Sequence, residues 1–248
     1  MKRVASLFVV LCALLWSGMS RADDKTITLT SLDWPPYTSA TLQAQGASAA
    51  VAKAAFEAMG YKLKIEFYPW SRAVDLAKNS KSHMGYFPEY YSADNAKTFT
   101  YSDAMGKGPL GFAERADAPV TWSKLSELAS KKIGVVQDYV NTDEFDGMVA
   151  AKQLKVDVAT DDSKNLLKLG GGRVDLAVVD QNVMNYLLNN DKDVKSLKGK
   201  IKFNSKLLED KKLFICFKKG PAGDKVAKVF NDGLKKINVE QIMSQYLK

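Results

Sequence analysis

The chain has 248 residues, which is enough for one large or two ordinary domains. Its composition is 46% hydrophobic and 26% charged, which is typical of a globular protein and excludes a disordered or fibrous chain. The formal net charge is +8. We interpret its lysine clusters as solvated faces rather than as a nucleic-acid surface; they are Lys195 to Lys202, Lys211-Lys212 and Lys218-Lys219.

The start of the chain has the pattern of a secretory signal peptide over residues 1–22. Lys2 and Arg3 precede an apolar run from Val4 to Trp16, and Ser20-Arg21-Ala22 forms a cleavage site. This apolar run is shorter than the roughly 18 residues of a membrane-spanning helix. We therefore predict cleavage after Ala22 and export to the periplasm. Removing the three basic residues of the leader lowers the net charge from +8 to +5.

The cysteines predict no disulfide. Cys12 lies in the leader, and the residues before it, Val9 to Leu11, do not form a lipid-attachment motif. Cys216 is then the only cysteine of the mature chain. Its apolar neighbours predict a small buried hydrophobic side chain.

Taken in order, the first part of the mature chain alternates strands and helices. A β-branched run predicts a strand over 26–30, and an alanine-rich segment predicts a helix over 47–59 that ends at Gly60. Pro69 opens a second helix. The other expected strands are 61–68, 84–87 (ended by Pro88), 98–102 and 110–113.

The alternation continues to the end of the chain. We expect strands over 132–137, 156–159, 174–179 and 212–217. We expect helices over 123–131 (with a serine cap), 142–154, 162–169, 182–188, 224–237 and 240–247. Strands and helices in this order are typical of parallel α/β sheets.

The stretch Asp33-Trp34-Pro35-Pro36-Tyr37 follows the first expected strand. The two prolines end that strand, so Trp34 and Tyr37 lie on a stiff turn at the carboxyl edge of the sheet, where ligands bind in open α/β folds. The alternative is that both aromatic rings only close the top of a hydrophobic core.

Two segments repeat one another weakly. Residues 76–89 and 166–180 each run from a helix through a polar turn to a short strand that ends at an acid, Glu89 or Asp180. Two similar α/β lobes would bring these strand ends to a shared crevice, and such interfaces are favoured ligand sites.

With these features the chain resembles the family 3 bacterial solute-binding proteins, the periplasmic receptors of amino-acid ABC importers. The motifs that carry the resemblance are Asp33 to Tyr37, Gly46, Ala96 to Asp103, Lys132 to Val136 and Gly172 to Asp180. The family implies a type II periplasmic binding fold with two Rossmann-like lobes joined by two crossing strands, which close by a hinge. The implied division is a signal peptide over 1–22, lobe 1 over 23–113, lobe 2 over 114–206 and a return to lobe 1 over 207–248.

The resemblance also implies a ligand site. The family's aspartate that binds a ligand ammonium corresponds to Asp180, although Asp180 is also placed to cap the following helix. The family's carboxylate-binding arginine corresponds to Asn95, which cannot supply a bidentate cation. Arg72 could compensate, or it could pair with Asp75 on the surface.

The other site candidates are aromatic or acidic. Aromatic walls could stack on the ligand, although we expect about half of these rings to belong to the core. They are Trp34, Tyr37, Trp70, Phe87, Tyr90 and Tyr139. Glu89 is a second acidic candidate, and Asp138 replaces the glycine of the family's second-lobe turn, which weakens the anion site expected there.

The sequence therefore predicts a monomeric periplasmic binding protein that captures a small polar, amine-bearing ligand for an ABC permease, with no cofactor. The alternatives are an exported enzyme of the same fold, with Glu89 and Asp180 as acid and base, and a ligand-presenting partner of a membrane sensor. His83, the only histidine, is expected to be structural, and no zinc-binding set of residues is present in the sequence.

Overall fold

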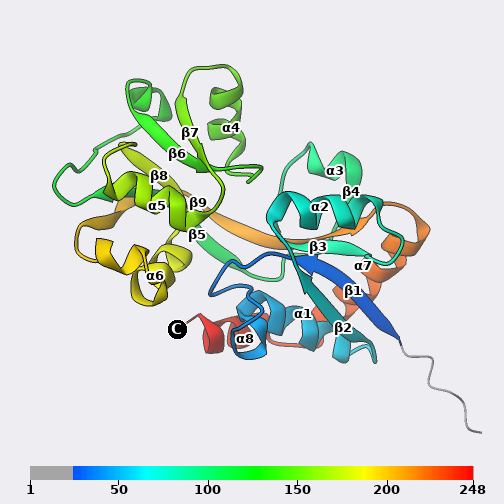
Figure 1. The fold of residues 1–248 in the computed structure, drawn as a ribbon. Coiled ribbons are helices and arrows are strands. Elements are labelled where there is room, and N and C mark those ends of the chain that lie inside the picture. The colour runs from blue at the N-terminus through cyan, green and yellow to red at the C-terminus, as the bar shows by residue number, and fades with distance from the viewer. Residues whose placement is uncertain (1–24, 248) are drawn as a thin grey trace, which may run out of the picture.

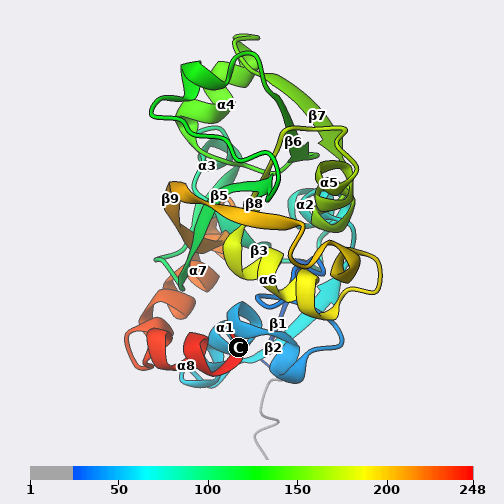
Figure 2. The same cartoon turned by 90° about the vertical axis from the view of Figure 1, so that its left-hand side faces the viewer.

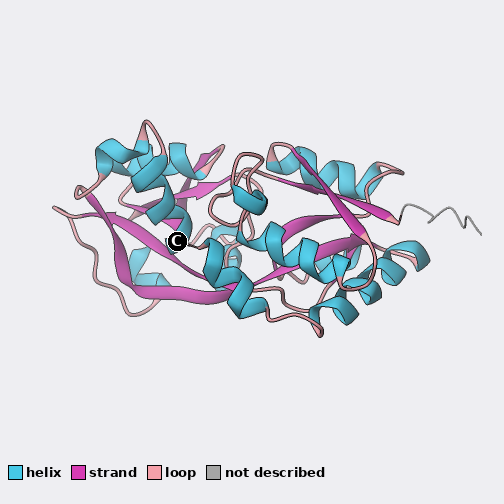
Figure 3. Ribbon diagram, turned by 90° about the horizontal axis from the view of Figure 1, so that it is seen from below, coloured by secondary structure: helices cyan, strands magenta, loops and turns pink. Residues whose placement is uncertain are grey.

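The computed structural model describes residues 25–247, and the predicted signal peptide lies outside them. Two lobes lie side by side, and two strands pass between them (Figures 1 and 2). The described strands form one sheet in the order β2-β1-β3-β9-β5-β8-β6-β7, with β4 paired to β9. Seen from below, the lobes form two separate groups of helices and strands (Figure 3).

Lobe 1 contains the first strands and the two ends of the described chain (Figure 1). Its strands are β1 (Thr26–Ser31), β2 (Lys62–Phe67), β3 (Gly85–Tyr90) and β4 (Phe99–Tyr101). Its helices are α1 (Ala47–Glu57), α2 (Trp70–Asn79), α3 (Asn95–Thr98), α7 (Pro221–Leu234) and α8 (Val239–Tyr246). Helix α1 packs against α7 and α8, while α2 packs against β1 and β3.

Lobe 2 contains the middle of the chain. Its strands are β6 (Lys132–Val136), β7 (Lys155–Ala159) and β8 (Leu176–Asp180). Its helices are α4 (Asp143–Ala150), α5 (Asp162–Gly170) and α6 (Gln181–Asn190). Short 3-10 helices lie at Gln43–Gln45 in lobe 1 and at Leu125–Leu128 and Val194–Leu197 in lobe 2.

The two crossing strands are β5 (Lys107–Arg115) and β9 (Ile201–Lys218), which pair in antiparallel register. Strand β9 also pairs with β3 and β4 of lobe 1, and β5 also pairs with β8 of lobe 2. The proposed lobe boundaries at residues 113 and 206 fall within these strands and stay a prediction.

The lobes repeat one topology. In lobe 1 the order is β2-β1-β3 with β9 antiparallel beside β3, and in lobe 2 it is β7-β6-β8 with β5 antiparallel beside β8. The central pairs of each lobe are parallel. The sheet is therefore mixed rather than purely parallel. The repeat detected in the sequence corresponds to α2–β3 and α5–β8, so Glu89 and Asp180 lie at equivalent strand ends.

Three predicted elements were wrong. The strand expected over 212–217 begins at Ile201, so its first half was missed. The strand predicted to end at Pro88 continues to Tyr90. Its pairing with β9 shifts register between Tyr86 and Glu89, so Pro88, which has no N–H to donate, does not have to form a ladder hydrogen bond. The helix expected over 123–131 is only a 3-10 turn without a side-chain cap. Its two buried residues, Leu125 and Leu128, are three apart, which matches the 3-10 period.

Cys216 is fully buried and free, which confirms its predicted role as a small hydrophobic side chain. It belongs to a core that includes Phe217 and Phe230 of lobe 1. No helix among residues 25–247 is long and apolar enough to cross a membrane.

Close packing of α7 on α1 depends on Gly233, because a Cβ atom there would lie 2.0 Å from the carbonyl oxygen of Ala55. We expect Gly233→Ala to lower the free energy of unfolding by about 1–3 kcal/mol, since the helices would be forced apart. Gly147 in α4 is the matched control, since a Cβ there meets nothing within 4 Å. Gly147→Ala should stabilise by up to about 1 kcal/mol. Urea unfolding measures both, and equal effects would contradict the packing argument.

Candidate functional site

The turn after β1 fixes two aromatic side chains at the boundary between the lobes. The amide of Tyr37 donates to the carbonyl of Trp34 at 3.0 Å, and the amide of Trp34 donates to the carbonyl of Thr38 at 2.7 Å. The rings of Trp34 and Tyr37 are stacked, with centroids 4.6 Å apart. Both rings are buried, so they belong to the core and also contact the opposite lobe.

The start of α1 holds this turn in place. The amides of Ala47 and Ser48 donate to the carbonyls of Pro36 and Tyr37, each at 2.9 Å. Gly46 precedes them with φ of 100°, and a Cβ there would lie 2.6 Å from the Tyr37 carbonyl oxygen. Only glycine fits this conformation and this approach without strain. The free amides of the helix start are thus used to position Tyr37.

Tyr37 contacts Asp180 across the lobe boundary. Its hydroxyl lies 3.2 and 3.1 Å from the two carboxylate oxygens and accepts a hydrogen bond from Asn182 Nδ2 at 2.7 Å. Asp180 also accepts from the amides of Asn182 and Val183 at 2.8 and 3.2 Å, so it caps α6 as anticipated. Capping α6 and binding a ligand ammonium are compatible roles for Asp180. The second role stays a prediction.

Three more hydrogen bonds join the lobes. Trp34 Nε1 donates to Asp162 Oδ2 at 3.1 Å, and Trp70 Nε1 donates to the carbonyl oxygen of Asp138 at 3.1 Å. Asp138 has φ of 61° and so keeps the left-handed backbone that a glycine would favour, while its carboxylate accepts from the hydroxyl of Ser71. Asp138 is therefore used to hold the lobes together.

The anion site considered at the second-lobe turn has its helix start already capped. The Thr142 hydroxyl accepts from the amide of Phe145 at 3.2 Å. Asp146 accepts from both the backbone amide and the side-chain amide of Asn141, each at 2.8 Å. A carboxylate beside the helix start opposes the binding of another anion there.

Between the lobes lies a small, mainly apolar cavity of about 30 Å³. Its lining residues are Leu32, Trp34, Trp70, Pro88, Glu89, Tyr90, Tyr139, Val140 and Leu213. Ligand pockets usually measure about 300 to 1,000 Å³, so this cavity is much smaller than a usual ligand pocket.

Glu89 is the acid that lines this cavity, and it is 5% exposed. It accepts hydrogen bonds from the Tyr86 hydroxyl at 3.0 Å, from Asn95 Nδ2 at 3.0 Å and from the amide of Tyr90 at 2.8 Å. Asn95, at the position of the family's arginine, thus supports a carboxylate of the protein. The Tyr90 hydroxyl is buried and forms no hydrogen bond within residues 25–247.

Three buried carboxyl groups surround this region, and burial is the main cause of their raised pKa values. Desolvation raises the pKa of Glu89 to about 8. It also raises the pKa of Asp180 to about 7, against the backbone hydrogen bonds that lower it. The pKa of Asp162 rises to about 7 through desolvation and then through repulsion by Asp180. The positive charge of Lys211 lowers the pKa of Glu89 against this desolvation.

The predicted site residues divide into three groups. The cavity lining includes Trp34, Trp70, Glu89, Tyr90 and Tyr139. Tyr37 and Asp180 meet beside it across the lobe boundary, and Asn95 reaches it only through Glu89. The structure does not bring the remaining two to the cavity. They are Phe87, which is fully buried, and Arg72, which is exposed on α2 and forms no ion pair with Asp75 within the described residues.

Three residues near the site were missed. Asp162 was interpreted only as a helix start, and Asn182 was placed only in the helix after Asp180. Lys211 was assigned to a solvated face, which is wrong because it is 5% exposed. Its burial could have been predicted, because every second residue after it in the strand is apolar and buried: Leu213, Ile215 and Phe217.

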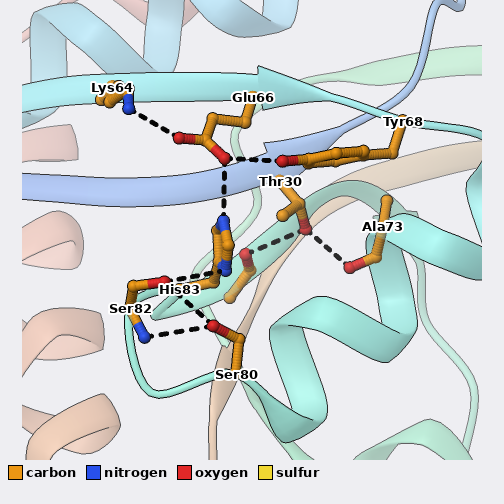
Figure 4. A network of polar contacts seen from close by, with 9 residues as sticks. Thr30, Lys64, Glu66, Tyr68, Ala73, Ser80, Ser82 and His83 are labelled. Carbon is orange, nitrogen blue, oxygen red and sulfur yellow. Dashed lines mark hydrogen bonds and ion pairs between the residues drawn. The ribbon is translucent and has the colours of Figure 1, made fainter.

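His83 lies in a different part of lobe 1, where its Nε2 is 3.0 Å from Glu66 Oε2 (Figure 4). The same carboxylate accepts from Tyr68 and pairs with Lys64. Hydrogen bonds from Lys64 and then from His83 lower the pKa of Glu66 to about 2. The network links β2 to the start of β3. Within residues 25–247, no group of three or more His, Cys, Asp or Glu side chains could hold a metal ion.

No family model matches the sequence, and no curated protein matches it. Solved structures do match. A histidine kinase sensor domain with similarity to periplasmic binding proteins has a TM-score of 0.75 at 18% identity, over 90% of this chain and 96% of that chain. An ancestral arginine-binding protein bound to arginine has a TM-score of 0.73 at 17% identity, over 90% and 98%.

A third match is an amino acid ABC transporter substrate-binding protein from Streptococcus pneumoniae bound to L-arginine, with a TM-score of 0.70 at 16% identity, over 90% of this chain and 92% of that chain. These likenesses and the observed topology confirm the predicted fold class, a two-lobed periplasmic binding protein fold.

The buried acids predict a pH dependence of stability. Their pKa values of about 7 to 8 in the folded protein exceed the ordinary values of 3.8 for aspartate and 4.5 for glutamate, so the folded state binds more protons than the unfolded state between these limits. Stability should therefore fall as the pH rises from about 5 to 8. Asp180→Asn, which preserves a capping side chain, should make the decline shallower. Thermal melts across this range measure it, and a stability that rises with pH would contradict the assignment.

Proposed function

We propose that this chain is a periplasmic solute-binding protein that captures a small polar, amine-bearing solute between its two lobes for an ABC importer. The observation that carries the proposal is the group of three buried carboxyl side chains, Glu89, Asp162 and Asp180, at the meeting of the lobes. Buried carboxylates require cations or hydrogen-bond donors, and a ligand ammonium supplies both.

Closure follows from the same residues. Asp180 belongs to lobe 2, while Trp34 and Glu89 belong to lobe 1. A solute that contacts both lobes binds more tightly when the lobes are closed. Its binding energy therefore shifts the hinge equilibrium toward the closed state. The aromatic side chains of Trp70 and Tyr139, whose ring centroids are 6.0 Å apart, would exclude water from the ammonium and form its walls.

A thermal-shift screen of amino acids, polyamines, small carboxylates and oligopeptides tests the binding class, since a solute that binds the folded state raises its melting temperature. We expect shifts with amine-bearing solutes and none with small carboxylates that lack an amine. A response restricted to anions, or no response to any class, would refute the proposal.

Asp180→Asn should weaken binding of the responding solute about 10- to 100-fold, because a charge-assisted hydrogen bond is lost. The matched control is Asp117→Asn, which removes a carboxylate whose side chain is 83% exposed. Isothermal titration calorimetry measures both affinities. Equal affinities of the two variants would remove Asp180 from the site.

The affinity for the amine should also rise with pH. Since the pKa values of Asp180 and Asp162 are about 7, each must ionise to pair with a cation. Affinity should increase up to about tenfold per pH unit between pH 5 and 7 for each proton released, and level off above. Titrations at constant ionic strength check this, and an affinity independent of pH would argue that neither acid contacts the amine.

The partner and the absence of turnover are separate parts of the proposal. Uptake of the bound solute should fall in a strain lacking the protein if an ABC permease is its partner. Unchanged uptake with a lost transcriptional response would favour a membrane sensor instead. Recovery of the solute unaltered after incubation would exclude the exported-enzyme alternative, in which Glu89 and Asp180 act as acid and base.

A further inference from the structure

Lys211 is a cation buried at the lobe boundary. It is 5% exposed, whereas the neighbouring Lys212 points to solvent. Lysine is rarely buried so completely without a close partner. The only ion pair of Lys211 within residues 25–247 is with Glu209, at 3.5 Å, and the Glu209 side chain is itself 50% exposed. Its charge also attracts the buried carboxylate of Glu89, with which it forms no hydrogen bond among the described residues. Its ammonium group therefore keeps hydrogen-bond donors for another acceptor.

The strand geometry directs Lys211 toward the site. Side chains two apart on a strand share a face, and Leu213 of β9 lines the cavity. The Nζ atom of Lys211 lies 5.5 Å from the ring centroid of Tyr90, which also lines the cavity. Lys211 therefore lies on the cavity side of β9.

The partner strand places Lys211 near Asp180 as well. Lys211 pairs with Gly108 of β5. A Cβ atom at Gly108 would lie 2.1 Å from the Tyr37 hydroxyl and 2.2 Å from Asp180 Oδ2. Directly paired residues project to the same face of a sheet. The ammonium of Lys211 and the carboxylate of Asp180 therefore belong to the same side of the crossing strands.

We propose that Lys211 binds the carboxylate of an α-amino acid whose ammonium group is held by Asp180. This rests on the proposed function and specifies its ligand class as a zwitterion. The two charges of the protein match the two charges of the ligand, and the surrounding aromatic rings lower the local polarity in which they attract. Lys211 thereby performs the task that Asn95, which donates to Glu89, cannot perform, while Arg72 is exposed on α2 and does not line the cavity.

The test compares amino acids with the amines that lack only their carboxylate. Suitable pairs are arginine with agmatine, lysine with cadaverine, tyrosine with tyramine, and histidine with histamine. Calorimetry on the wild-type protein should give an amino acid that binds about 10- to 100-fold more tightly than its amine. In Lys211→Met, which retains an unbranched stem, the preference should fall to within about threefold.

Lys212→Met is the matched control and should keep the wild-type preference, because its side chain is exposed. The ratio of the two affinities is the decisive measurement, since a general loosening of the lobes would weaken both ligands alike. Lys211→Gln provides the same reading if the methionine variant does not fold. An unchanged ratio in the Lys211 variant overturns the inference.

The inference and the proposed function fail differently. Wild-type protein that binds the amines as tightly as the amino acids overturns the role of Lys211 and leaves the proposed amine-binding function standing. Wild-type protein that binds neither member of any pair, nor any other amine, overturns both.

Discussion

Burial of carboxyl groups at the boundary between two lobes is the constraint on which the remaining structure depends. Glu89, Asp162 and Asp180 are all buried, and water no longer solvates them adequately. A buried acid must be protonated, hydrogen-bonded or paired with a cation. The tyrosine and tryptophan donors of lobe 1 satisfy part of this requirement, so the same groups that close the lobes also hold the acids.

Backbone hydrogen bonds, rather than further side chains, hold those donors in position. Amides at the start of α1 bind the carbonyls of the Pro36–Tyr37 turn, which leaves the Tyr37 hydroxyl free to cross to Asp180. Gly108 is required for the approach, because any larger residue of β5 would displace both groups. The contact therefore lies directly on a crossing strand, where hinge motion can make or break it.

Much of the fold was predictable because the regular elements have strong local patterns. The alanine-rich α1 and the alternation of β2 are examples, and the repeat of α2–β3 in α5–β8 anticipated the equivalent positions of Glu89 and Asp180. Errors arose where tertiary pairing overrides local preference. Pro88 is accommodated by a register shift in β3, and no local pattern indicates a shift that depends on β9, more than a hundred residues later.

The site was only partly predictable for a similar reason. Aromatic and acidic residues near strand ends were recognised, since position in an α/β sheet suggests their exposure to a crevice. Lys211 was not, because lysines next to one another are usually solvated and its burial requires β5, Tyr90 and lobe 2 together. Asp162 and Asn182 lie at helix starts, where local capping alone would explain them.

Competition between internal contacts and a ligand follows from this arrangement. The Tyr37 hydroxyl and Asn182 already form a hydrogen-bonded chain to Asp180, so the ligand ammonium that we propose would share that carboxylate with them. A carboxylate has several acceptor positions, and two donors to one oxygen leave the other able to accept more. Asp180 Oδ1 accepts from both helix amides and lies 3.2 Å from the Tyr37 hydroxyl, whereas Oδ2 lies 3.1 Å from that hydroxyl and accepts from no backbone amide among the described residues. Under the proposed function, the second oxygen is therefore the one that a cationic solute would share with Tyr37.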